Sequence, residues 1–208
     1  TNVAVGYQAG RVVTEGINNT LLGPYAGYDL TTGTGNTLLG SEANGNNSTG
    51  TNNTIVGYQA GTGVHGNSHN GNDFFGYSSA ASLITTGTYN TMLGYEAGRY
   101  IAKGSYSVAV GVQAGLYATA SANTFVGGYA GYGGNSSAPY SSGGSNTAIG
   151  YEALKGFTTG ERNVAIGMEA YSYGATDGVR NTFVGQGAGN TNFGSNQVGI
   201  GYAAFQQY

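Results

Sequence analysis

The chain contains no cysteine and no tryptophan, and only 7% of its 208 residues are charged. Without cysteine, disulfide bonds cannot stabilise the fold, so durability outside a cell must come from backbone pairing and burial between subunits. The net charge is −3, and the six Lys and Arg residues are scattered along the chain. Because no basic stripe is present to neutralise phosphates, we expect no nucleic-acid binding. No apolar run approaches ~18 residues, so we expect no membrane insertion within this segment.

Glycine is abundant instead, with 41 residues, and a short phrase recurs along the whole chain. Each copy reads Asn, Thr or Val, two apolar residues, Gly, two variable residues and Ala, as in residues 53–60. Self-similarity at a fixed period is typical of solenoids, in which each coil packs on its neighbours. We therefore predict one all-β domain over 1–208, a parallel β-roll or β-solenoid of about twelve coils of 16–19 residues. The anchor glycines are expected to form structural corners: Gly6, Gly23, Gly40, Gly57, Gly76, Gly94, Gly111, Gly127, Gly150, Gly167, Gly185 and Gly201.

A coil of this length is too short for a strand, a helix and two turns, so we expect two short strands and two corners. The residue directly before the anchor Gly is apolar in every copy, as in Leu22 and Leu93, which predicts that it forms the core. Asn usually lies four residues before the anchor, and Gly usually lies three residues before that Asn. We interpret both as turn residues, because both tolerate positive φ. The Ala three residues after the anchor predicts close approach of neighbouring backbones.

The two residues before that apolar position exchange bulk. Thr is followed by a large residue, as in Thr54-Ile55, whereas Val is followed by a small one, as in Val164-Ala165. Successive strand residues face opposite sides, so both faces of the strand carry apolar groups. Strands buried on both faces show such near-continuous apolar runs. One thin coil cannot cover both of its own faces, so we predict a second chain as the cover and an obligate oligomer.

The phrase resembles the head repeats of trimeric autotransporter adhesins, and similar repeats are found in bacteriophage tail-fibre and tail-spike proteins. The nearest matches are residues 146–153 and 163–170, and the resemblance covers essentially the whole chain. It implies a left-handed parallel β-roll, an intertwined homotrimer and surface attachment. The adhesin repeats are nearer 14 residues, so the longer period here implies larger loops and leaves the handedness open. No stalk coiled coil or membrane anchor is present in these residues.

Tyrosine is the most abundant aromatic residue, with 18 copies, and it often follows the anchor Gly, as at Tyr58, Tyr95 and Tyr151. One interpretation is a ladder of stacking platforms for cell-surface sugars. The preferred one is packing at an interface, with the hydroxyl reaching water or a partner chain. The longest insertion, between Gly131 and Asn146, is expected to form a surface loop. If that loop binds a ligand, the candidate residues are Tyr132, Asn135 and Tyr140.

Three other patterns carry weaker expectations. His65 and His69 are four residues apart, but their Gly- and Asn-rich segment is not a helix, so we expect no metal and no cofactor. The Glu residues two positions after the anchor, such as Glu96 and Glu152, are interpreted as a solvated rim rather than a catalytic pair. Asn-Thr pairs would form a Thr ladder if their side chains face outwards, which superficially resembles ice-binding solenoids, but the spacing is uneven.

Together these observations predict a protein that is not an enzyme. We expect a homotrimeric fibre module at the cell surface or on a virion tail, attaching to cell-surface glycans or other receptors. The alternative is a structural subunit that stacks end to end into an extracellular filament.

Overall fold

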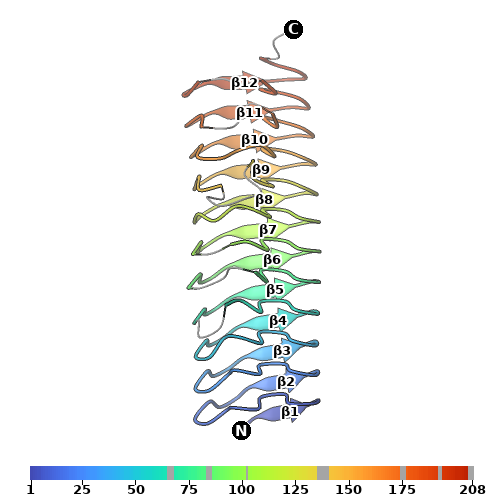
Figure 1. Cartoon of the computed structure of the whole chain (residues 1–208). Helices are drawn as coiled ribbons and strands as arrows, with labels where there is room; N and C mark the ends of the chain where they lie inside the picture. The colour runs from blue at the N-terminus through green and yellow to red at the C-terminus, as the bar shows by residue number, and fades with distance from the viewer. Residues whose placement is uncertain are drawn as a thin grey trace.

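The computed structural model describes residues 1–64, 68–82, 86–101, 103–134, 141–173, 177–191 and 194–205. The chain winds into a rod, a β-solenoid of about eleven turns (Figure 1). Within the described residues each coil contributes one strand, not the expected two, and the rest of the coil is built of turns. The strands are β1 (Val3–Val5), β2 (Thr20–Leu22), β3 (Thr37–Leu39), β4 (Thr54–Val56), β5 (Asp73–Phe75), β6 (Thr91–Leu93), β7 (Val108–Val110), β8 (Thr124–Val126), β9 (Thr147–Ile149), β10 (Val164–Ile166), β11 (Thr182–Val184) and β12 (Val198–Ile200).

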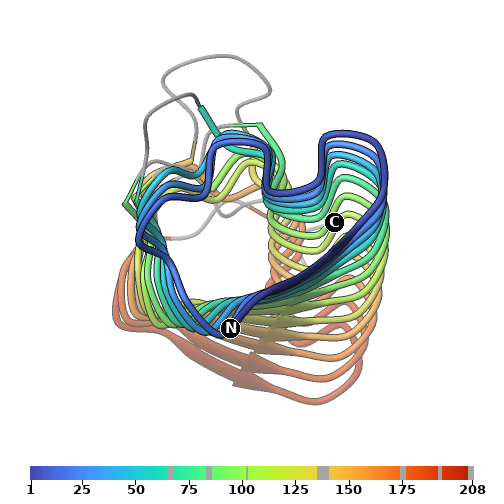
Figure 2. The ribbon, with the colours of Figure 1, turned by 90° about the horizontal axis from the view of Figure 1, so that it is seen from below.

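All twelve strands form one parallel sheet in chain order. Each strand pairs with the next in the same register, so that Thr20 lies beside Thr37 and Leu21 beside Leu38. Equivalent residues of successive coils therefore stack into columns along the rod. The view down the rod shows the coils superimposed in outline, with the strands along one side (Figure 2). The expected parallel solenoid is confirmed at this level.

The side chains of the middle strand residues point into the core. Leu21 and Met92 are each 1% exposed, whereas Leu22 and Leu93, the residues directly before the anchor Gly, are 49% and 48% exposed. The expectation that the residue before the anchor forms the core was wrong. In a three-residue strand the middle side chain points to one face and its two neighbours to the other. The outer face of the sheet therefore carries two rows, one mainly of Thr and Val and one of aliphatic residues.

Bulk in the interior is shared between the middle strand residue and the residue four after the anchor Gly. Where the first is large the second is usually Gly: a Cβ on Gly61 would lie 2.8 Å from Ile55 Cδ1. In two of the four coils where the first is Ala, the second is large: Leu154 and Tyr171 are completely buried in the coils of Ala148 and Ala165. In the coils of β9 and β10 the small middle residue is thus compensated inside the coil itself and does not require a partner chain.

Two coils break this pattern, because both members of the pair are small: the coil of β1, with Ala4 and Gly10, and the coil of β7, with Ala109 and Gly115. A small cavity remains in the coil of β7, lined by Met92, Ile101 and Phe125 among others. Close packing leaves few such voids in protein interiors, and this one lies where neither member of the pair fills the space.

All twelve anchor glycines have positive φ, from 121° to 140°, which confirms them as corners. Most also lie against the next coil: a Cβ on Gly57 would be 2.4 Å from the carbonyl oxygen of Gly76. The Gly that precedes Asn by three residues has a different role. A Cβ on Gly33 would be 2.3 Å from the carbonyl oxygen of Gly50, although φ at Gly33 is not positive. Close backbone approach, rather than a left-handed turn, requires glycine at that position.

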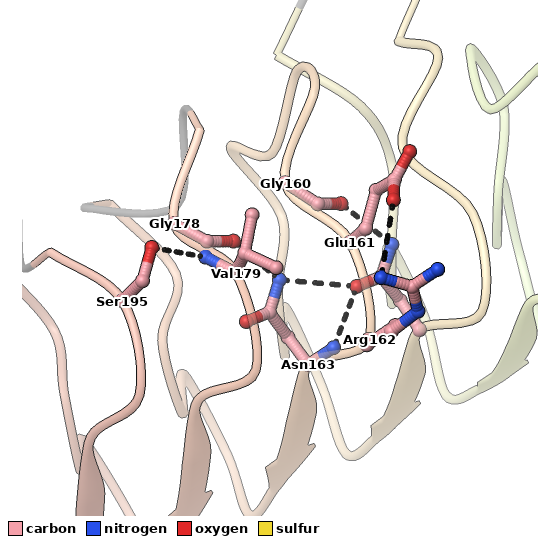
Figure 3. Close-up of polar contacts among 8 residues, drawn as sticks. Gly160, Glu161, Arg162, Asn163, Gly178, Val179 and Ser195 are labelled. Carbon is pink, nitrogen blue, oxygen red and sulfur yellow. Dashed lines mark hydrogen bonds and ion pairs between the residues drawn. The ribbon is translucent and has the colours of Figure 1, made fainter.

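The repeated Asn is not a turn residue, which corrects the sequence interpretation. Positive φ belongs to the residue before it, such as Tyr89 (58°) or Arg162 (57°). The Asn side chains are buried and form a hydrogen-bonded ladder along the rod. Asn163 donates its backbone N–H (2.9 Å) and its side-chain amide (3.1 Å) to Oδ1 of Asn146, and the same amide donates to the carbonyl oxygen of Gly178 at 2.8 Å (Figure 3). Every such bond satisfies a buried polar group, which makes Asn costly to replace.

Candidate functional site

The tyrosines predicted as binding residues fall into two separate groups. Tyr58 and Tyr95 lie on either side of Tyr77, with ring centroids 5.5 and 5.3 Å apart and interplanar angles of 22° and 9°. We call these three residues the tyrosine ladder. A sugar stacks on the face of an aromatic ring, but both faces of Tyr77 and one face each of Tyr58 and Tyr95 are occupied by neighbouring rings. The ladder is built for packing between coils rather than for stacking of a ligand.

The second group, the tyrosine cluster, consists of Tyr117, Tyr129, Tyr132 and Tyr151. These rings meet mostly edge to face: Tyr117–Tyr132 at 5.2 Å and 87°, and Tyr129–Tyr151 at 5.9 Å and 84°. Tyr129 also contacts Tyr132, with centroids 5.8 Å apart and a tilt of 48°. In an edge-to-face pair the edge of one ring covers one face of the other ring, whereas in a parallel stack each ring covers a face of its neighbour. The structure therefore brings the predicted residues Tyr132 and Tyr151 into one cluster, joined by Tyr129, which the sequence reasoning missed.

Charged groups border the tyrosine cluster. Lys155 Nζ lies 5.7 Å from the centre of the Tyr129 ring and 2.9 Å from Glu152 Oε1. The hydrogen bond to Glu152 raises the pKa of Lys155, and a hydrogen bond to the same carboxylate raises the pKa of Tyr151. The pKa of Tyr117 is raised mainly by partial burial and, to a smaller extent, by a hydrogen bond with Tyr132. Lys155 therefore stays protonated and both phenols stay neutral near pH 7, which leaves hydroxyl groups as donors and acceptors.

An open groove lies beside the cluster, and we call it the upper groove. Its lining combines aromatic, cationic and hydroxyl groups with glycine backbone: Tyr132, Gly133, Gly134, Lys155, Gly156, Ser172 and Tyr173. Backbone hydrogen bonds hold its wall, from Gly133 N–H to the Lys155 carbonyl (3.0 Å) and from Gly156 N–H to the Ser172 carbonyl (2.9 Å). The predicted residues Asn135 and Tyr140 lie outside the described residues.

A second open groove, the lower groove, was not predicted from the sequence. It is lined by Tyr25, Tyr28, Glu42, Gly45, Asn46 and Thr62. Glu42 accepts a hydrogen bond from Gln59 Nε2 at 2.7 Å, and Arg11 donates to the Tyr28 hydroxyl, so the polar groups at this groove are held in place. Tyr28, Gly45 and Thr62 occupy the same repeat position, five residues after the anchor, as Tyr132, Lys155 and Ser172. That shared position is the signal by which the sequence could have revealed both grooves.

The Glu column is not a solvated rim throughout. Glu96 is only 7% exposed, and it accepts a hydrogen bond from Gln113 at 2.7 Å and pairs with Arg99. Glu42 and Glu152 are half-buried. These carboxylates connect neighbouring coils or neighbouring turns, because each is held against a fixed partner.

The histidine segment gives no metal site within the part of the chain that the structure describes, where no three His, Asp or Glu side chains gather. His65 lies outside that part. His69 is completely buried, and its Nε2 lies 3.3 Å from the carbonyl oxygen of Gly61 while Asn72 Nδ2 lies 3.4 Å from its Nδ1. Burial lowers the pKa of His69 from 6.5 to about 4, partly opposed by the hydrogen bond to Gly61. No described helix is long and apolar enough to cross a membrane.

The outer face of the sheet carries the Thr side chains, as the Thr-ladder hypothesis required, but most of them are only half-exposed. The row is interrupted by Val and by Asp73. Next to it runs the aliphatic row, in which Ile149 is 40% exposed and Val126 is 36% exposed. This face is therefore mainly an apolar surface that is partly open to solvent.

Comparison with known proteins adds no identification, since no family model, no curated protein and no solved structure matches the chain.

Proposed function

We propose that this chain is a non-catalytic attachment module that binds a carbohydrate in the upper groove, as part of a fibre outside a cell or on a virion tail. The observation that carries the proposal is the tyrosine cluster beside that groove. Sugars present apolar C–H faces flanked by hydroxyl groups. Tyrosine rings suit the first, and the Lys155 ammonium and the glycine backbone suit the second.

The expected result of replacing Tyr132 with Ala is a loss of glycan affinity of about tenfold or more, since aromatic anchors dominate small binding sites. A glycan array identifies the ligand, and titration calorimetry on the best-bound glycan measures the change. Tyr89→Ala is the matched control, because Tyr89 is 60% exposed and lines neither groove. Equal affinity of Tyr132→Ala and the parent chain would remove the upper groove from consideration. Shortening of the bound glycan, followed by mass spectrometry, would contradict a non-catalytic role.

We also propose that three copies of the chain associate through the outer face of the sheet. The support is the row of apolar residues at the ends of the strands, which is partly exposed along the rod, because extended apolar patches mark interaction surfaces. Ile149→Lys places a charge in that row, and light scattering should show a shift from trimer towards monomer. Glu161→Lys, on an exposed residue away from the strands, is the control and should leave the mass unchanged. A parent chain that is monomeric at micromolar concentration would overturn the trimer.

A further inference from the structure

The two grooves lie on the same edge of the rod. Successive coils are joined there by backbone hydrogen bonds from the residue six after one anchor to the residue five after the next. The bonds run Gly63 N–H to Ala81 O (3.0 Å), Ser82 N–H to Arg99 O (2.9 Å), Tyr100 N–H to Leu116 O (3.0 Å), Tyr117 N–H to Tyr132 O (2.8 Å) and Gly133 N–H to Lys155 O (3.0 Å). Asn46 and Thr62 of the lower groove are joined in the same sense at 3.2 Å. Within the described residues these bonds continue along one edge from the lower groove to the upper groove, and we call this edge the track.

Each groove spans three successive coils, so its length runs along the rod rather than around it. Asn46 follows β3 and Lys155 follows β9, six coils further along the sheet. At a strand spacing of about 4.8 Å, the two grooves are about 29 Å apart. A single sugar fills one groove, whereas only an extended chain reaches both.

The track between the grooves presents side chains that suit a sugar chain. Arg99 donates to Ser82 Oγ at 3.0 Å and lies 5.5 Å from the centre of the Tyr100 ring. Tyr100 in turn stacks on Tyr117, with centroids 5.0 Å apart, and so leads into the tyrosine cluster. The charges along this edge are mostly paired, Lys155 with Glu152 and Arg99 with Glu96. The track therefore favours a ligand without net charge.

From this placement we infer that the ligand is a linear, uncharged polysaccharide that lies along the rod and occupies both grooves at once. The inference rests on the proposed carbohydrate binding and adds the form of the ligand and a second site. Linking two contacts in one chain makes the second binding event intramolecular, which raises affinity by about 10² to 10⁴ without any new kind of contact. Short oligomers of the same sugar gain nothing from the second groove.

The test measures affinity against oligomer length, using a size series of the neutral glycan that binds best on the array. We expect weak binding for short oligomers and a rise of at least about 100-fold once the oligomer is long enough to reach both grooves. Tyr28→Ala, in the lower groove, should abolish that rise and leave short-oligomer affinity for the upper groove unchanged. Tyr89→Ala should alter neither.

The outcomes separate the inference from the proposed function. Binding of short oligomers with no further gain on lengthening would overturn the two-groove inference and leave carbohydrate binding intact. A gain that survives Tyr28→Ala would also overturn it. No binding of any oligomer, short or long, would contradict the proposed function itself.

Discussion

Replacing Leu154 with Gly should lower the free energy of unfolding by about 3 kcal/mol, and adding Ala148→Leu in the same chain should restore most of that loss. Leu154 is completely buried, so its removal leaves a cavity in the core of the β9 coil. Ala148→Leu alone should also destabilise, by about 1–3 kcal/mol, because it forces a large side chain against Leu154. The double variant instead adopts the arrangement of the β2 coil, in which a large Leu21 faces Gly27.

Thermal and urea unfolding of the four proteins form a double-mutant cycle, which isolates the coupling between the two positions. The backbone at Leu154 is left-handed, with a φ of 53°, so a Gly there removes conformational strain. This gain in stability is the same in both variants that carry the Gly. Thr147→Ala, on the half-exposed outer side of the same strand, is the control and should cost less than about 1 kcal/mol. Additive losses in the double variant would show that the two side chains do not share the same interior space.

The pairing between the middle strand residue and the residue four after the anchor was not predicted from the sequence. The strict recurrence of Gly57 and its equivalents predicted the corners and the stacked coils, because a positive φ and close backbone approach both exclude a side chain. The period of two in Thr54-Ile55-Val56 predicted that opposite faces carry different residues. It did not say which face is inside, since both carry apolar groups, and the more regular aliphatic column turned out to face outwards. The residue that fills the interior together with the middle strand residue lies four residues after the anchor, outside the strand pattern.

The site was predicted in part for a similar reason. Tyr132 was named as a candidate because a long insertion points to a surface loop, and Tyr151 because it follows an anchor. Whether a tyrosine offers a free face depends on the angle to its neighbour, which differs between Tyr77–Tyr95 (9°) and Tyr129–Tyr151 (84°). Tyr77, Tyr95 and Tyr151 all occupy the same repeat position, so the position in the repeat cannot distinguish a tyrosine that packs between coils from one that could bind a ligand. The lower groove combines side chains from three successive coils, which the register of the strands places side by side.

Lowering the pH from about 6.5 to about 4 should destabilise the coils of β4 and β5, because His69 is buried there as a neutral ring. Its pKa is lowered from 6.5 to about 4 by burial, so in this window the unfolded chain binds a proton that the folded chain does not. Stability contributed by the neutral ring is fully present above pH 6.5 and is lost as the pH falls towards 4. The difference corresponds to a loss of about 3 kcal/mol. Below pH 4 both states are protonated and the loss is complete.

His69 lies three residues before Asn72 of the asparagine ladder, at a position where most coils have Gly. Its carbonyl oxygen accepts a hydrogen bond from Asn53 Nδ2 at 2.9 Å, as the carbonyl oxygen of Gly87 does from Asn72 Nδ2. His69→Gly therefore removes the titrating ring and keeps a residue that the fold accepts at this place. Hydrogen-exchange protection factors of β4 and β5, compared with those of β10 and β11, should fall between pH 6.5 and 4.5 in the parent chain and stay level in the variant. An NMR titration in which the His69 ring protonates near pH 6.5 in the folded chain would refute the assignment. The buried ring makes the coils of β4 and β5 acid-labile while those of β10 and β11 keep their protection, because each coil of a solenoid is stabilised only by its neighbours.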